Sequence, residues 1–92
     1  MKLVWTGRAR TDLDRVWLFL AERDIALADG VTREIQLRCD RLVEFPRIAP
    51  TVTRDIRQWS MPNIGYVVTY TIDGDQIRIR RVHHAQEDRE RA

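Results

Sequence analysis

The sequence is short of several residue types, and each shortage excludes a class of structure. Its 92 residues include a single cysteine, Cys39, so no disulfide can form within the chain. It contains no apolar run of about 20 residues, the length that a membrane-spanning helix needs, and no signal-peptide pattern. We therefore expect a protein of the reducing cytoplasm, without a membrane segment.

Lysine is almost absent as well, since Lys2 is the only one and arginine supplies the other basic side chains. The net charge is only +2, but it is unevenly distributed. Residues 1–46 hold eight Lys or Arg against eight Asp or Glu, whereas residues 47–86 hold six Arg against three Asp. Such an excess suits an acidic protein segment or a nucleic acid, although a solvated basic surface is its more frequent cause.

Motifs for cofactors and metals are missing too. No glycine-rich phosphate-binding motif occurs, and Cys39, His83 and His84 lack the spacing of metal ligands. We expect no cofactor and no metal site. Cys39 falls on an apolar helical stripe, which predicts a small core residue and not a nucleophile.

The clearest structural signal is a β-hairpin within Gly65–Gln86. Two runs rich in β-branched and aromatic residues flank the turn Asp73-Gly74-Asp75. The second run alternates isoleucine with arginine, so one face is apolar and the other basic: Ile77, Arg78, Ile79, Arg80. Val82 breaks this alternation, which predicts a β-bulge near Arg80 and Arg81 that returns Val82 to the core. We expect this hairpin to form the middle of a sheet.

Helical periodicity occupies the first half of the chain. Met1–Trp5 is compatible with a strand, and Thr6 can cap a helix that begins near Arg8. Its apolar stripe is formed by Ala9, Leu13, Val16, Trp17 and Leu20, while Arg8, Asp12, Arg15 and Glu22 are expected to face away.

A second amphipathic helix follows after Asp24 and ends at Phe45-Pro46. Its stripe is formed by Ala28, Val31, Ile35, Cys39 and Leu42. The connection between the helices is so short that they must be antiparallel neighbours.

The second half of the chain completes the predicted fold. The alternation in Val52–Gln58 predicts a strand, and Trp59–Ile64 is expected to be a connection, because Pro62 is unsuited to a central strand. The predicted order is a strand, an antiparallel two-helix hairpin and a three-stranded antiparallel sheet. We expect a single α+β domain over residues 1–92, with the helices on one face of the sheet.

Taken together, these segments resemble the RelE/ParE superfamily of toxins from bacterial type II toxin-antitoxin modules, the ParE side more than the RelE side. The resemblance covers the whole domain and is carried by Trp5–Thr6, Ala9–Leu13, Leu42–Pro46, Thr53–Ile56, Tyr66–Tyr70 and Ile77–Gln86. Arg80 and His83 depart from the pattern, because the family often has apolar residues there. The resemblance implies a RelE/ParE-like fold and a toxin that a cognate antitoxin neutralises.

It also implies a target, which differs between the two branches. ParE toxins act on DNA gyrase and have no known hydrolytic site, whereas RelE toxins cleave mRNA in the ribosome. A third hypothesis is a degenerate member that only binds its antitoxin. One fold serves all three, so the fold does not decide among them.

Residue chemistry separates the first two hypotheses. A ribosome-dependent RNase needs groups for proton transfer and cations for the phosphate. The candidates here are His83, His84, Arg54 and Arg81. RelE-like members supply these groups from clustered Lys and Arg on the strands and from a Tyr or His near the C-terminus. Because no tyrosine follows Tyr70 and lysine is scarce here, the resemblance favours a gyrase inhibitor over an enzyme. For binding of the target or partner we expect Arg54, Arg57, Trp59, Arg78, Arg80 and Arg81.

Overall fold

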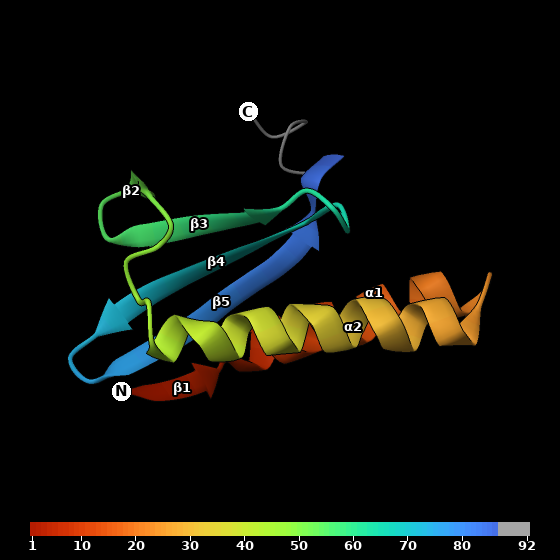
Figure 1. Ribbon diagram of the computed structural model, residues 1–92, viewed down its shortest axis with the longest axis horizontal. Coiled ribbons are helices and arrows are strands. Elements are labelled where there is room, and N and C mark those ends of the chain that lie inside the picture. Colours follow the sequence, from red (N-terminus) through yellow and green to blue (C-terminus); the bar gives the residue numbers. More distant parts are fainter. Residues whose placement is uncertain (87–92) are drawn as a thin grey trace.

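The computed structural model describes residues 1–86, in which two antiparallel helices cover one face of a five-stranded sheet (Figure 1). The elements are β1 (Lys2–Trp5), α1 (Gly7–Ala21), α2 (Ile25–Asp40), the 3-10 helix η1 (Arg41–Val43), β2 (Thr51–Thr53), β3 (Ile56–Met61), β4 (Tyr66–Asp73) and β5 (Gln76–His84). This arrangement confirms the predicted α+β class and the helical hairpin. It adds a fifth strand to the prediction, and α2 gives way to η1 before Phe45.

Both helices begin at the predicted caps. The Thr6 hydroxyl accepts a hydrogen bond from the Ala9 backbone N–H at 3.2 Å, and an Asp24 carboxylate oxygen accepts one from the Leu27 N–H at 3.2 Å. Each cap satisfies a backbone donor that has no partner within the helix.

The strands lie in the order β1-β5-β4-β3-β2, so the β4–β5 hairpin is at the centre, as predicted. β1 occupies one edge and pairs in parallel with β5, with Lys2 opposite Gln76 and Trp5 opposite Ile79. The other neighbouring strands are antiparallel. The position of β1 was not predicted, because no local pattern indicates which strand it joins.

The predicted β-bulge is confirmed. Thr69 pairs with Arg81 and Tyr70 pairs with Ile79, so Arg80 is an extra residue in β5. The extra residue shifts the alternation by one position, and Val82 is consequently only 3% exposed.

The prediction of one strand over Val52–Gln58 is wrong. Arg54 and Asp55 form a turn between β2 and β3, in which Arg54 adopts the left-handed conformation with φ 46°. β3 then continues to Met61, so Trp59 lies within a strand and not in a connection. The turn was missed because it contains neither glycine nor proline, the usual signals of a tight turn.

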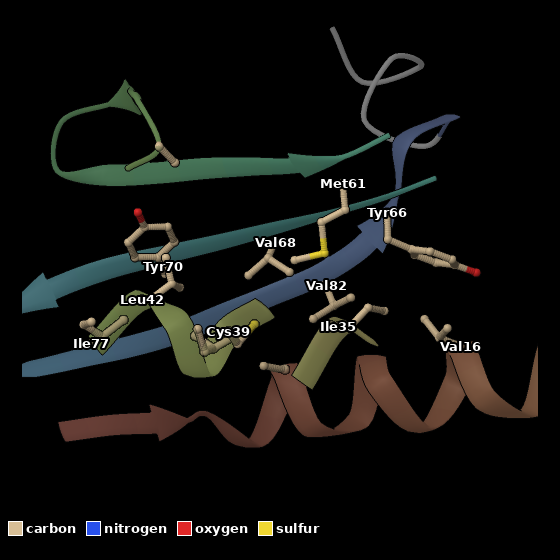
Figure 2. Close-up of a cluster of buried hydrophobic side chains, with 13 residues drawn as sticks. Val16, Ile35, Cys39, Leu42, Met61, Tyr66, Val68, Tyr70, Ile77 and Val82 are labelled. Atoms are coloured by element: carbon tan, nitrogen blue, oxygen red, sulfur yellow. The ribbon is translucent and has the colours of Figure 1, made fainter. Parts of the chain in front are cut away.

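The core lies between the helices and the sheet (Figure 2). Its largest fully buried side chains include Tyr70 and Ile77 from the sheet and Ile35 and Leu42 from the helical segment. The Tyr70 hydroxyl donates a hydrogen bond to the Pro46 carbonyl at 2.8 Å, which ties the loop after η1 to the sheet.

Trp17 departs from its predicted place in the core. It is half-buried, and its indole N–H donates to an Asp29 carboxylate oxygen at 2.7 Å, linking α1 to α2.

Candidate functional site

The bulge in β5 is held by a buried carboxylate from α1. Asp12 is only 6% exposed. Its carboxylate accepts hydrogen bonds from Arg81 Nε at 2.8 Å and Arg81 Nη2 at 3.2 Å, and a third from the Val82 backbone N–H at 2.9 Å. A paired carboxylate with three donors is well satisfied in a buried place. The prediction that Asp12 faces away from the core is therefore wrong.

Thr6 holds the other side of the same bulge. Its hydroxyl lies 2.8 Å from the Ile79 carbonyl oxygen and 3.2 Å from that of Arg80, and its backbone N–H donates to the Ile79 carbonyl at 3.2 Å. The bulge is thus fixed by residues from the first 12 positions of the chain. Local sequence near Arg80 gives no sign of these contacts.

A pocket of about 510 Å³ lies between α1 and the end of β5. We call it the histidine pocket, and it is lined by Asp12, Arg15, Val16, Phe19, Tyr66, Arg81, Val82, His83, His84 and Gln86. It combines apolar side chains from both elements with two arginines and both histidines. Both histidines border this pocket, because they are the last two residues of β5 and the pocket lies at the end of that strand.

His84 has a defined place at the end of the strand. Its Nδ1 accepts a hydrogen bond from the Gln86 backbone N–H at 3.0 Å. Its ring packs edge to face against Tyr66, with ring centroids 5.3 Å apart. Both contacts fix the orientation of the imidazole. His83 is half-buried beside it and pairs with Val67 in the sheet.

A second depression, of about 600 Å³, crosses the face of the sheet that the helices leave open. We call it the arginine trough, and it is lined by Thr6, Gly7, Arg8, Arg54, Asp55, Ile56, Thr71, Asp73, Arg78, Arg80 and Arg81. Four of the predicted binding residues, Arg54, Arg78, Arg80 and Arg81, thus come together here. They come from the β2–β3 turn and from β5, and all but the partly buried Arg81 are exposed.

Two other predicted binding residues lie elsewhere. Arg57 Nη1 donates to the Ala49 carbonyl at 2.6 Å, so its guanidinium anchors the loop before β2. Trp59 is half-buried and packs against the core from β3. Neither lines the histidine pocket or the arginine trough.

Cys39 is fully buried, as predicted. Burial raises the pKa of its thiol to about 12, with a smaller contribution from the negative charge of Asp40. Because the thiolate is the nucleophilic form, Cys39 is inert near neutral pH. Within residues 1–86, no three His, Cys, Asp or Glu side chains are grouped to hold a metal ion. In the same part of the chain, no helix has the length and apolar character needed to cross a membrane.

Asp12 is the functional candidate that sequence reasoning missed. The signal was present, because Asp12 lies three residues after Ala9 and four before Val16, both of which are buried. These spacings place it on the buried face of α1. An acidic residue on such a stripe indicates a basic partner elsewhere in the fold.

Comparisons with known proteins identify the family. The family described as ParE toxin of type II toxin-antitoxin system, parDE, matches residues 3–89. The toxin RelE1 of Caulobacter vibrioides is 30% identical over 84 residues, which cover 89% of this chain and 90% of that protein.

A solved structure supports the fold. A chain of the chromosomal ParDE TA system from P. aeruginosa aligns with a TM-score of 0.77 at 19% identity, covering 91% of this chain and 95% of that one. At this identity the likeness concerns the fold alone. The family match over residues 3–89 and the 30% identity to RelE1 show the family, because each covers most of the chain. This chain therefore belongs to the ParE toxin family of type II toxin-antitoxin systems.

Proposed function

We propose that this toxin acts on DNA gyrase in the cytoplasm, turning the enzyme into a source of DNA breaks, and that a cognate antitoxin binds the toxin and neutralises it. An antitoxin partner follows from membership of the family. Gyrase is the target that the likeness to the ParE branch implies, and the arrangement of charged side chains in this chain supports it over RNA cleavage.

The observation that carries the proposal is that three of the arginines expected to bind a target lie apart from the two histidines. Arg54, Arg78 and Arg80 line the arginine trough, whereas His83 and His84 line the histidine pocket. Arg81 borders both, but its guanidinium makes a bidentate pair with buried Asp12. RNA cleavage requires proton-transfer groups and cations around one phosphate. Separate depressions suit a protein that acts by binding.

One observation favours ribosome-dependent mRNA cleavage as the second candidate function. Both histidines border a single pocket, to which α1 contributes Arg15. A phosphate in that pocket would have an imidazole and an exposed guanidinium nearby. The third hypothesis, a member that only binds its antitoxin, predicts no activity on either target.

The deciding experiment presents the purified toxin to gyrase with supercoiled DNA and, in parallel, to translating ribosomes. We expect gyrase-dependent DNA breaks and intact mRNA, with both reactions repeated in excess antitoxin as the control. His84→Gln keeps an acceptor for the Gln86 N–H but removes proton transfer by imidazole. On the gyrase hypothesis this variant causes as many gyrase-dependent DNA breaks as the wild type.

The opposite result is equally clear. mRNA cleavage that falls about a hundredfold or more in His84→Gln is the loss typical of removing a general acid or base. If gyrase were unaffected at the same time, the RelE-type activity would replace our proposal. Inactivity in both assays, with antitoxin binding retained, would establish the third hypothesis.

A further inference from the structure

Two residues that line the arginine trough, Thr6 and Arg81, hold the bulge. The placement of the other arginines in the trough indicates a ligand. The trough extends from the junction of β1 and α1, across β5 and β4, to the turn between β2 and β3. Its floor is the sheet face opposite the core. Arg78 lies on that face because its neighbours Ile77 and Ile79 are both 0% exposed on the other.

Two unusual backbone features place arginines in the trough. Arg80 is the extra residue of the bulge, which Thr6 and Asp12 hold from either side. Arg54 occupies the turn with φ 46°, a conformation that is strained for a residue other than glycine. Bulges and left-handed residues of this kind concentrate at functional surfaces.

The charge of the trough is positive. Besides Arg81, which Asp12 neutralises, four arginines face two aspartates, Asp55 and Asp73. Asp73 accepts a hydrogen bond from the Thr71 hydroxyl at 2.9 Å and lies 3.8 Å from Arg78 Nε. Both members of that ion pair are about half exposed, at 50% and 48%, so water screens their attraction. Arg78 is therefore available to an incoming anion.

The lining also distinguishes among polyanions. Ile56 is the only apolar side chain among the described residues of the trough, and none of them is aromatic. A bound protein segment is normally anchored by buried apolar or aromatic side chains. Single-stranded nucleic acid normally stacks its bases on aromatic rings. Arginine and hydroxyl groups without such rings are typical of contacts to a sugar-phosphate backbone.

We propose that the arginine trough binds the phosphate backbone of double-stranded DNA without reading its sequence. The inference deepens the proposed function and rests on it for its biological setting: the toxin would contact the DNA that gyrase holds as well as the enzyme. Arg8, Arg54, Arg78 and Arg80 supply the phosphate contacts.

Direct binding tests the proposal without gyrase. The free toxin is titrated into a short fluorescent DNA duplex and anisotropy is recorded between about 50 and 200 mM salt. If four arginines each neutralise one phosphate, the slope of log K against log salt is about −3.6. Two duplexes of unrelated sequence should give the same affinity.

A double variant and a matched control locate the binding surface. Arg78→Gln with Arg80→Gln should weaken binding about tenfold or more at the lowest salt and make the slope shallower by about two. Arg33→Gln with Arg41→Gln removes two exposed arginines from α2 and η1, outside the trough, and should leave both values unchanged. Far-ultraviolet circular dichroism and the midpoint of thermal unfolding confirm that the variants fold.

Two outcomes would overturn the trough proposal. One is equal DNA affinity in the double variant and the wild type. The other is a loss of antitoxin affinity in the double variant with no loss of DNA affinity, which would assign the trough to an acidic protein segment.

Gyrase cleavage assays separate this inference from the proposed function. If the double variant generated gyrase-dependent breaks as efficiently as the wild type, the trough would have no role in the action on gyrase. The proposal that gyrase is the target would stand. If the wild type bound DNA through the trough but left gyrase unaffected, the gyrase proposal would fail and the DNA site would stand.

Discussion

Asp12 shows how one residue connects two distant parts of the chain. Its carboxylate reaches Arg81 and the Val82 N–H, about 70 positions later, from the first half of α1. Burying a charge is costly unless it is paired and hydrogen-bonded, and Asp12 is both. The residue therefore contributes to the position of the bulge as well as to stability.

Replacing Asp12 tests this role. Asp12→Asn keeps the size of the side chain but removes the negative charge from a half-exposed arginine and a buried N–H. We expect the free energy of unfolding to fall by about 1–3 kcal/mol, the range for hydrogen bonds to charged groups. Urea denaturation followed by circular dichroism measures the loss.

Asp14→Asn is the matched control, since Asp14 is exposed on the same helix. Its unfolding free energy should stay within about 0.5 kcal/mol of the wild type. Equal stability of the two variants would mean that the Asp12 contacts contribute nothing net to the fold.

Side-chain roles followed from the sequence only where neighbours in the chain determine them. The alternation of Ile77, Arg78 and Ile79 was enough to place Arg78 on the open face of the sheet. Arg57 was expected to bind a target or partner, and nothing in the sequence indicated that its guanidinium donates to the Ala49 carbonyl, in a loop whose path depends on the whole fold. Local periodicity assigns a face and does not identify a long-range partner.

Among the elements, α2 contains a position that is not optimised for stability. Gly30 lies inside the helix, is exposed, and has open space where a Cβ would stand. Gly30→Ala should raise the unfolding free energy by about 0.5–1 kcal/mol, because glycine loses more conformational freedom in a helix than alanine does. Thermal unfolding should show a higher midpoint.

The same substitution at Gly74 should act in the opposite direction. A Cβ there also meets nothing within 4 Å, but φ is +61°. Gly74→Ala should therefore destabilise the β4–β5 hairpin through backbone strain alone. A stabilised Gly74→Ala variant, or a destabilised Gly30→Ala variant, would contradict the backbone argument.

Helices and strands were predictable where residues typical of turns or helix caps mark their ends. The β4–β5 hairpin has glycine in its turn, and both helices have capping residues, so these elements were found. The β2–β3 turn consists of Arg54 and Asp55, and a continuous alternation through them imitated one strand. The division of this segment into β2 and β3 depends on how the strands pair in the sheet, which the local sequence does not show.

At the scale of the whole molecule, the core depends on the short segment η1. Leu42 lies there at 0% exposure, next to β1 and near Tyr70 and Ile77 of the sheet (Figure 2). Leu42→Ala should lower the unfolding free energy by about 2–5 kcal/mol. Small domains have only about 5–15 kcal/mol in total, so a large part of the stability would be lost.

Leu37→Ala provides the comparison, because Leu37 is 54% exposed on α2. Chemical denaturation of both variants should show a loss several times larger for Leu42. A loss below about 1 kcal/mol for Leu42→Ala would mean that the core had been misassigned.

The parallel pairing of β1 with β5 also constrains how the chain matures during synthesis. Residues 2–5 leave the ribosome more than 70 positions before their partners at positions 76–79. Until then β1 and β4 both lack β5, the strand that lies between them, and the apolar face of the sheet is incomplete. The Asp12 carboxylate also lacks its partner Arg81. Pairing over such a long separation is slow to form, because loop closure precedes the contacts that stabilise it. The toxin therefore acquires its fold only after β5 has been synthesised, and a chain that stops before β5 contains neither the histidine pocket nor the arginine trough.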